Sequence, residues 1–175
     1  MTKEQIWIEA GYHTFAYEGP QALRIEKLAK KVKKNKSSFY HFFSDMEIFI
    51  GRLLDYHLEQ AKVMSIKESS VQNQSELTQI FLDHKLDLLF NRQLRIHRER
   101  LDFEACFTRT NEISLPGFIP IWKKIINLDE NSHLAEVVLM LSIDNFFLQI
   151  TENTLNRDWI TSFFEKNREM VKLFK

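Results

Sequence analysis

The segment from Lys36 to His41 contains the residue types in this chain that are best suited to binding a charged polymer. It supplies an ammonium group, hydroxyl groups and an imidazole, from Lys36, Ser37, Ser38, Tyr40 and His41. Such groups form hydrogen bonds with phosphate oxygens and with the edges of nucleic-acid bases. The segment therefore predicts a surface that contacts nucleic acid.

Two short helices joined by a turn would position these side chains. Apolar residues occur at helical spacing on both sides of the polar run Lys33-Lys34-Asn35: Leu28, Ala29 and Val32 before it, and Phe39, Phe42 and Phe43 after it. If both apolar sets are buried together, the polar side chains of the second helix stay outside. This pattern is typical of a helix-turn-helix unit.

Basic residues are concentrated around this unit. The whole chain has 24 basic and 24 acidic side chains, but seven basic residues and a single acid, Glu26, lie between Arg24 and Lys36. A solvated, lysine-rich helix face would also explain the run, yet its register with the helix-turn-helix pattern favours DNA. The candidate DNA contacts are Arg24, Lys33, Lys34, Lys36, Ser37, Ser38, Tyr40 and His41. Tyr40 has a second interpretation, as a half-buried core residue with its hydroxyl outside.

Composition indicates an all-α protein. The 175 residues are 44% apolar and include 15 phenylalanines, which is enough for a substantial core, whereas four glycines and three prolines leave few residues for hairpins. The lone Cys106 cannot form an internal disulfide, and neither a leader segment nor a membrane span is indicated, so we expect a cytoplasmic protein.

Apolar spacing and turn residues divide the chain into about nine helices. We expect a first helix from a Thr2 cap to Gly19-Pro20, a third from about Lys36 to Phe43, and a long fourth beginning at a Ser44 cap. Residues 65–75 are expected to form a loop. Residues 77–90 are expected to form one helix, which Asn91 ends, and Pro116-Gly117 is expected to end the helix after it. A turn is expected near Asp129 and Asn131. Two apolar helices, over 134–150 and from Trp159 onward, complete the chain.

The first part of the sequence resembles the tetracycline-repressor-like (TetR) transcriptional regulators, over roughly Trp7 to Phe49. WIEAGYHTFAYEG is similar to the first helix of that family, and LAKKVKKNKSSFYHFF is similar to its helix-turn-helix, with a signature at Lys36, Tyr40 and Phe43. The resemblance implies a DNA-binding domain at residues 1–46 and a helical dimerisation and effector-binding domain at residues 47–175.

Three positions depart from the family pattern. The family usually has glycine and a small apolar residue in the turn, where this chain has Lys33 and Lys34, and often has a lysine near the start of the fourth helix, where this chain has Met46. If Lys33 has a positive φ, the turn costs about 1 kcal/mol. Lys34 and Met46 motivate an alternative function, a helical protein-interaction module that has kept the scaffold but lost sequence-specific DNA binding.

The resemblance also implies how such a protein would act. We expect a homodimeric repressor that binds a palindromic DNA operator in successive major grooves, with a small-molecule effector as a further partner. The last two helices would pair with those of a second copy. The candidate dimer residues are Val138, Leu141, Phe146, Phe147, Ile160, Phe163 and Phe164.

Aromatic side chains in the C-terminal region have two interpretations. Phe81, Phe103, Phe107 and Trp122 could line an apolar effector pocket, or they could pack as ordinary core residues at helical spacing. We expect no enzyme activity, catalytic residue, metal site or cofactor. The six histidines are not arranged as a zinc site, and no glycine-rich phosphate loop is present. The nearest approach to a titratable pair is His84 with Asp87.

Overall fold

Helices make up all the regular secondary structure in residues 2–128 and 132–173, the parts of the chain that the computed structural model describes. The elements are α1 (Lys3–Glu18), the 3-10 turn η1 (Pro20–Ala22), α2 (Ile25–Lys31), α3 (Lys36–Tyr40), α4 (Met46–Glu68), α5 (Gln74–Asp83), α6 (Lys85–Ile96), α7 (Leu101–Ile125), α8 (Ser132–Gln149) and α9 (Arg157–Lys172). The predicted all-α class is confirmed, and these residues contain nine α-helices.

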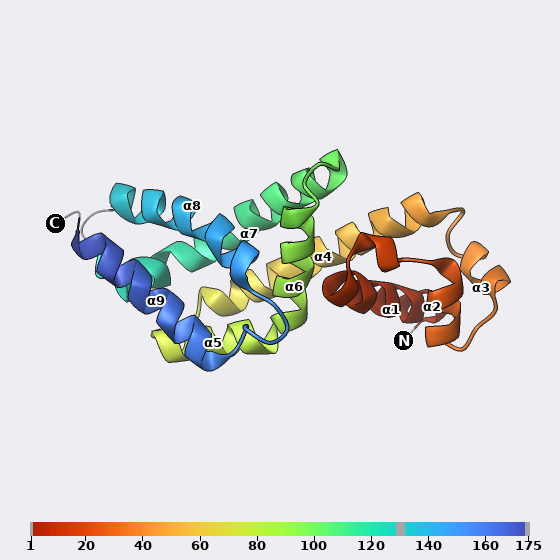
Figure 1. Cartoon of the computed structure of the whole chain (residues 1–175), viewed down its shortest axis with the longest axis horizontal. Helices are drawn as coiled ribbons and strands as arrows, with labels where there is room; N and C mark the ends of the chain where they lie inside the picture. Colours follow the sequence, from red (N-terminus) through yellow and green to blue (C-terminus); the bar gives the residue numbers. More distant parts are fainter. Residues whose placement is uncertain (1, 129–131, 174–175) are drawn as a thin grey trace.

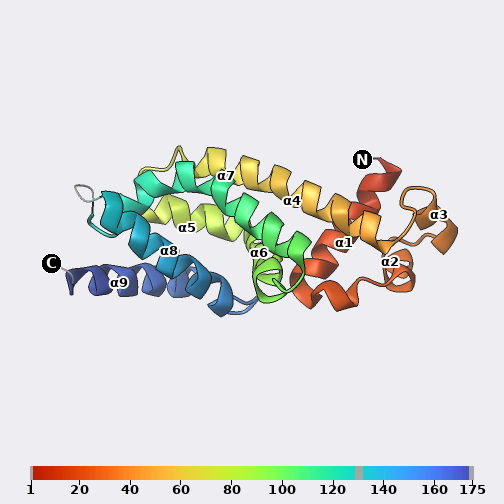
Figure 2. The same cartoon turned by 90° about the horizontal axis from the view of Figure 1, so that it is seen from above.

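The helices form an elongated molecule with α1, α2 and α3 at one end and α5, α8 and α9 at the other (Figure 1). The long helix α4 begins beside α3 and extends into the opposite half, where it runs alongside α7 (Figure 2). Helix α6 crosses the middle of the molecule and contacts α1, α7 and α8. It therefore connects the two ends.

The ends of α1 are fixed by the residues that the sequence indicated. The Thr2 side chain accepts a hydrogen bond from the Gln5 backbone at 3.1 Å, which caps the first turn. Gly19 has a φ of 84°, and its N–H donates to the Phe15 carbonyl at 2.9 Å. A glycine suits this end of the helix because other residues rarely adopt a positive φ.

Aromatic packing fixes α3 to the rest of its end of the molecule. The Phe39 ring is fully buried and lies 5.4 Å from Trp7 and 5.2 Å from Phe49, measured between ring centroids. Phe43 packs in the same cluster, 5.0 Å from Phe39. Because edge-on aromatic contacts constrain orientation as well as distance, the exposed side of α3 is held in a defined direction.

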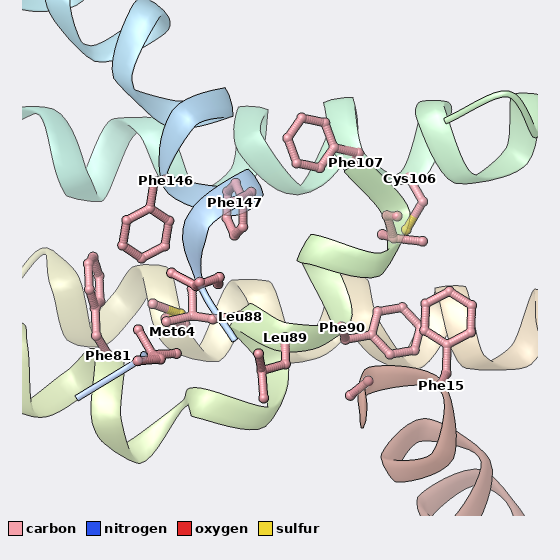
Figure 3. Close-up of a cluster of buried hydrophobic side chains, with 14 of the residues drawn as sticks. Phe15, Met64, Phe81, Leu88, Leu89, Phe90, Cys106, Phe107, Phe146 and Phe147 are labelled. Carbon is pink, nitrogen blue, oxygen red and sulfur yellow. The ribbon is translucent and has the colours of Figure 1, made fainter. Parts of the chain in front are cut away.

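The core continues from α1 into α6 and α7. Phe90 stacks against both Tyr12 and Phe15, at centroid distances of 4.3 and 4.2 Å, and Phe103 meets Phe15 edge-on at 5.3 Å. Figure 3 shows Phe15 and Phe90 side by side at this junction. The boundary expected after residue 46 falls in the first turn of α4, and the division into two domains stays a prediction.

Several expected helix ends were wrong. Helix α3 stops at Tyr40, α4 continues to Glu68, and Asp45, not Ser44, caps α4 by accepting a hydrogen bond from the Ile48 N–H. The helix expected over 77–90 is two helices separated at His84, and Asn91 lies inside α6. Helix α7 continues through Pro116-Gly117 to Ile125. The turn expected near Asp129 and Asn131 lies outside the described residues.

Close packing of α4 against α7 explains why Pro116 does not end α7. Gly117 is buried, and a Cβ atom placed on it would lie 2.6 Å from the Ser65 carbonyl oxygen of α4. The Ser65 hydroxyl donates to the Ile113 carbonyl at 2.9 Å, so α4 also occupies a carbonyl of the α7 backbone near the proline. Both prolines of α7 are exposed. None of the described helices is long and apolar enough to cross a membrane.

Candidate DNA-binding surface and internal cavity

Helix α3 presents a row of polar side chains at one end of the molecule. Lys36, Ser37, Tyr40 and His41 are exposed and Ser38 is half-buried, while Phe39 of the same helix is fully buried. Tyr40 is 55% exposed, and its ring meets the Phe39 ring edge-on at a centroid distance of 5.7 Å, so part of the ring packs on the core while the rest faces solvent. The expected division of this helix into a buried aromatic side and an exposed polar side is therefore observed.

The turn before α3 contains the strain that the sequence suggested. Lys33 has a φ of 54°, a conformation that costs a lysine about 1 kcal/mol relative to glycine. The turn is held by a backbone hydrogen bond of 2.9 Å from the Lys34 N–H to the Ala29 carbonyl. Asn35 then caps α3 by accepting from the Ser38 N–H at 2.9 Å.

The basic residues of this end differ in how they are paired. Lys36 donates to Glu26 at 2.6 Å, which lowers the pKa of that carboxyl group. Lys27 is paired with Glu18. Among the described residues, no carboxylate pairs with Lys30, Lys33 or Lys34, and these three lysines are exposed, as is Arg24. The positive charge of this end is thus concentrated in the turn and beside α3.

A cavity of about 90 Å³ lies in the other half of the molecule, between α4, α5, α6, α7, α8 and α9. Phe81 and Trp122 line it, as expected. Phe103 and Phe107 do not, which corrects the expected set. Phe103 packs toward α1 against Phe15, and Phe107 meets Phe147 edge-on at 5.5 Å. Figure 3 shows Met64, Phe81, Leu88 and Phe146, four lining residues, grouped apart from Phe15 and Phe90.

The cavity also contains polar groups that the sequence analysis missed. Glu68 lines the cavity, is only 3% exposed, and its Oε2 has no hydrogen-bond partner among the described residues. Burial raises the pKa of Glu68 to about 8, because the charged form loses its hydration. A signal was present: Glu68 continues the buried stripe of α4 at helical spacing, after His57, Ala61 and Met64.

A chain of hydrogen bonds connects the cavity wall to α1. The Tyr12 hydroxyl donates to Asp87 Oδ1 at 2.8 Å and lies 2.7 Å from His57 Nδ1. The other Asp87 oxygen is 2.7 Å from His84 Nδ1, and Lys67 donates to His84 Nε2 at 2.8 Å. The sequence had indicated the pairing of His84 with Asp87. His57 and Asp87 both line the cavity, so this network extends from α1 to the cavity wall.

Burial determines the protonation of two members of this network. Burial lowers the pKa of His57 to about 4, so its imidazole is neutral near pH 7. Burial and the nearby Asp87 carboxylate raise the pKa of Tyr12 well above its ordinary value, so its hydroxyl keeps its proton. The single Tyr12 hydroxyl proton is donated to Asp87, so the contact of that hydroxyl with His57 requires a proton on Nδ1, while His57 Nε2 lies 3.3 Å from Asn91 Oδ1.

Comparison with known proteins gives a structural match only. Neither a family model nor a curated protein sequence matches the chain. A crystal structure of a candidate TetR-family transcriptional regulator from Mesorhizobium loti MAFF303099 superposes with a TM-score of 0.61. The superposition covers 98% of this chain and 94% of that one, at 17% sequence identity. The chain has a TetR-like fold.

Within this TetR-like fold, most of the expected dimer residues are internal. Leu141 is 68% exposed, but the other six are covered by helices of the same chain and cannot offer surface to a partner: Val138, Phe146, Phe147, Ile160, Phe163 and Phe164. Three of the six lie on α8 and three on α9, and the sequence did not show which side of either helix is covered by its own chain. The exposed apolar side of α8 consists of Val137, Met140, Leu141 and Leu148, called the α8 apolar face below.

Proposed function

We propose that this protein is a DNA-binding transcriptional regulator that acts as a homodimer, with α3 of each subunit in the major groove of an operator. The observation that carries the proposal is the exposed row on α3, Lys36, Ser37, Tyr40 and His41, above a fully buried Phe39. A helix fixed from behind by aromatic rings can present hydroxyl and basic groups to base edges without first having to be ordered. The unpaired lysines of the turn would lie against the phosphate backbone.

The proposed dimer would use the α8 apolar face. Monomeric proteins seldom leave several large apolar side chains together on one helix surface, whereas a two-fold partner would cover them. A two-fold dimer also presents two copies of α3, as a palindromic operator with half-sites about 34 Å apart requires. Repression would follow from occupation of promoter DNA.

A small-molecule effector would act through α6. This helix lines the cavity with Asp87, Leu88 and Asn91, and Asp87 bonds to Tyr12 of α1. It also contacts α8, where Arg95 forms two hydrogen bonds with Asp144 at 2.7 and 2.6 Å. A ligand that moved α6 would therefore change the position of α1 relative to the dimer surface, and with it the separation of the two recognition helices.

The test is a fluorescence anisotropy titration of the full chain with DNA selected from a random pool. We expect tight binding to sites with two-fold symmetry, and binding that weakens as salt is increased. Lys36→Ala should lower the slope of log K against log salt by about one, because one phosphate contact is lost. Lys62→Ala is the matched control, since Lys62 is also exposed and paired with a glutamate but lies on α4 away from α3.

Two outcomes would contradict the proposal. Absence of any sequence-preferring binding would favour the protein-interaction module, for which Lys34 and Met46 are the motivating residues. An unchanged salt slope in Lys36→Ala would remove the assignment of α3 to the phosphate-contacting surface, even if the protein bound DNA.

A further inference from the structure

The cavity combines an apolar wall with one acid that lacks a partner. Aromatic rings form much of the wall, including Phe81, Phe118 and Trp122. Two other titratable side chains reach the wall, His57 and Asp87, and both are engaged in the Tyr12 network. Glu68 differs because its Oε2 is buried without a hydrogen bond among the described residues.

An unpartnered buried carboxyl group is costly to keep in a protein interior. Packing alone would be better served by an apolar side chain or a glutamine, and no charged group contributes to the raised pKa of Glu68, which burial alone explains. A ligand that supplies a hydrogen-bond donor or a positive charge would remove this cost. A carboxylate ligand would increase it, because two acids would then share one site.

We propose that the cavity binds a small organic cation, an ammonium group on a short alkyl chain, with its nitrogen held by Glu68. The carboxylate would accept charge-assisted hydrogen bonds from the ammonium group, and the aromatic rings would contact the chain and the positive charge. The size follows from the volume. At about 90 Å³ the cavity is smaller than an engineered cavity of about 150 Å³ that holds benzene, so a chain of about four carbons suits it.

The biological meaning of this inference rests on the proposed effector response. Its test does not, because binding of the cation to the cavity can be measured without DNA. The probes are n-butylamine, 1-butanol and butyrate, which share a four-carbon chain and differ in the head group. In calorimetric titrations of the full chain at pH 9, above the pKa of about 8 to which burial raises Glu68, n-butylamine should bind at least 10-fold more tightly than 1-butanol, as expected for a hydrogen bond to a charged group. Butyrate should not bind measurably.

Variants locate the site. Glu68→Gln keeps the shape of the side chain but cannot become charged, so it should remove the preference for n-butylamine over 1-butanol. Glu59→Gln removes an exposed carboxyl group from the same helix and should bind all three probes as the original chain does. Ala61→Leu adds volume at a residue that lines the cavity and should weaken n-butylamine and 1-butanol alike. Circular dichroism establishes that each variant is folded.

Equal affinity for n-butylamine and 1-butanol, or no binding of either, would overturn the inference. So would a preference that persists in Glu68→Gln, because the cation would then bind elsewhere. If Glu68→Gln does not fold, the comparison of Ala61→Leu with the original chain still tests whether the cavity is the site. DNA binding by the original chain in the absence of ligand, measured separately, distinguishes failure of this inference from failure of the proposed function.

Discussion

Lys33 shows how a single residue can be strained at the place where the proposed function resides. Its φ of 54° suits glycine, so Lys33→Gly should raise the free energy of unfolding by about 0.5 to 1 kcal/mol. Lys34→Gly is the matched control: it removes the same charge at the next position, where φ is not positive, and should lower stability slightly. Urea denaturation measures both. A loss of stability in Lys33→Gly would show that the lysine side chain contributes more than its backbone conformation costs.

Glu68 should make stability depend on pH in a defined direction. The pKa of Glu68 is raised from 4.5 to about 8 on folding. The contribution of Glu68 to the free energy of unfolding is therefore fully present below pH 4.5 and is lost as the pH rises toward 8. The free energy of unfolding of the original chain relative to Glu68→Gln should therefore fall by about 1.4 kcal/mol per pH unit across that range. Urea denaturation at several pH values measures the difference, with Glu59→Gln as the control for loss of a carboxyl group from α4. A difference independent of pH would mean that Glu68 is hydrated.

The sequence was more informative about exposed residues than about buried polar ones. Lys36 and Tyr40 could be placed outside because the phenylalanines around them have helical spacing, which is a local property. The burial of Glu68 depends on helices far along the chain that close over the end of α4. The helical spacing of Glu68 after Ala61 and Met64 was a signal, but only the packing shows that this side of the end of α4 is covered. Phe103 could not be distinguished from Phe81 as a cavity residue for the same reason.

At the scale of elements, the contact between α4 and α7 can be tested through glycine. Gly117→Ala would place a Cβ 2.6 Å from the Ser65 carbonyl oxygen, so the helices would have to separate, at a cost of about 1 to 3 kcal/mol. Gly51→Ala is the matched control, because nothing lies within 4 Å of its added Cβ and it is inside α4. It should stabilise by about 0.5 to 1 kcal/mol. Urea denaturation compares them, and equal effects would exclude tight α4–α7 packing.

Helix ends were predicted well where the signal was a local cap and poorly where tertiary packing decided. Thr2 and Gly19 act through their own side-chain and backbone chemistry, so α1 could be delimited from sequence. Pro116 was expected to end a helix, but the packing of Gly117 against α4 stabilises the helix through it. The break at His84 was missed because the apolar period continues across it.

At the scale of the molecule, α6 is the element through which distant parts can affect one another. It holds α1 through Asp87 and Tyr12, lines the cavity, and is tied to α8 by Arg95 and Asp144. The buried core is also continuous from α1 into α6 and α7, so α1 cannot shift without disturbing the stacking of Phe15 on Phe90. A change at the cavity or at a dimer surface therefore has a rigid route to the proposed recognition helix.

The proposed dimer requires the α8 apolar face to be covered, and Leu141 lies on that face. Leu141→Glu should leave the fold unchanged, because the side chain is 68% exposed, but would bury an unpaired charge between subunits. We expect the dimer dissociation constant to rise by about 100-fold, corresponding to about 3 kcal/mol. In sedimentation equilibrium the original chain should have twice the 21.0 kDa mass of one chain, and the variant should approach the single mass.

The control for this substitution is Leu101→Glu, since Leu101 is 86% exposed at the start of α7 and is outside the α8 apolar face. It should remain dimeric. Leu141→Glu should also bind an operator with two half-sites far more weakly, while binding to one half-site should change little, because α3 itself is untouched. A single-chain mass for the original protein at micromolar concentration would exclude the dimer. Dissociation in Leu101→Glu but not in Leu141→Glu would place the interface elsewhere.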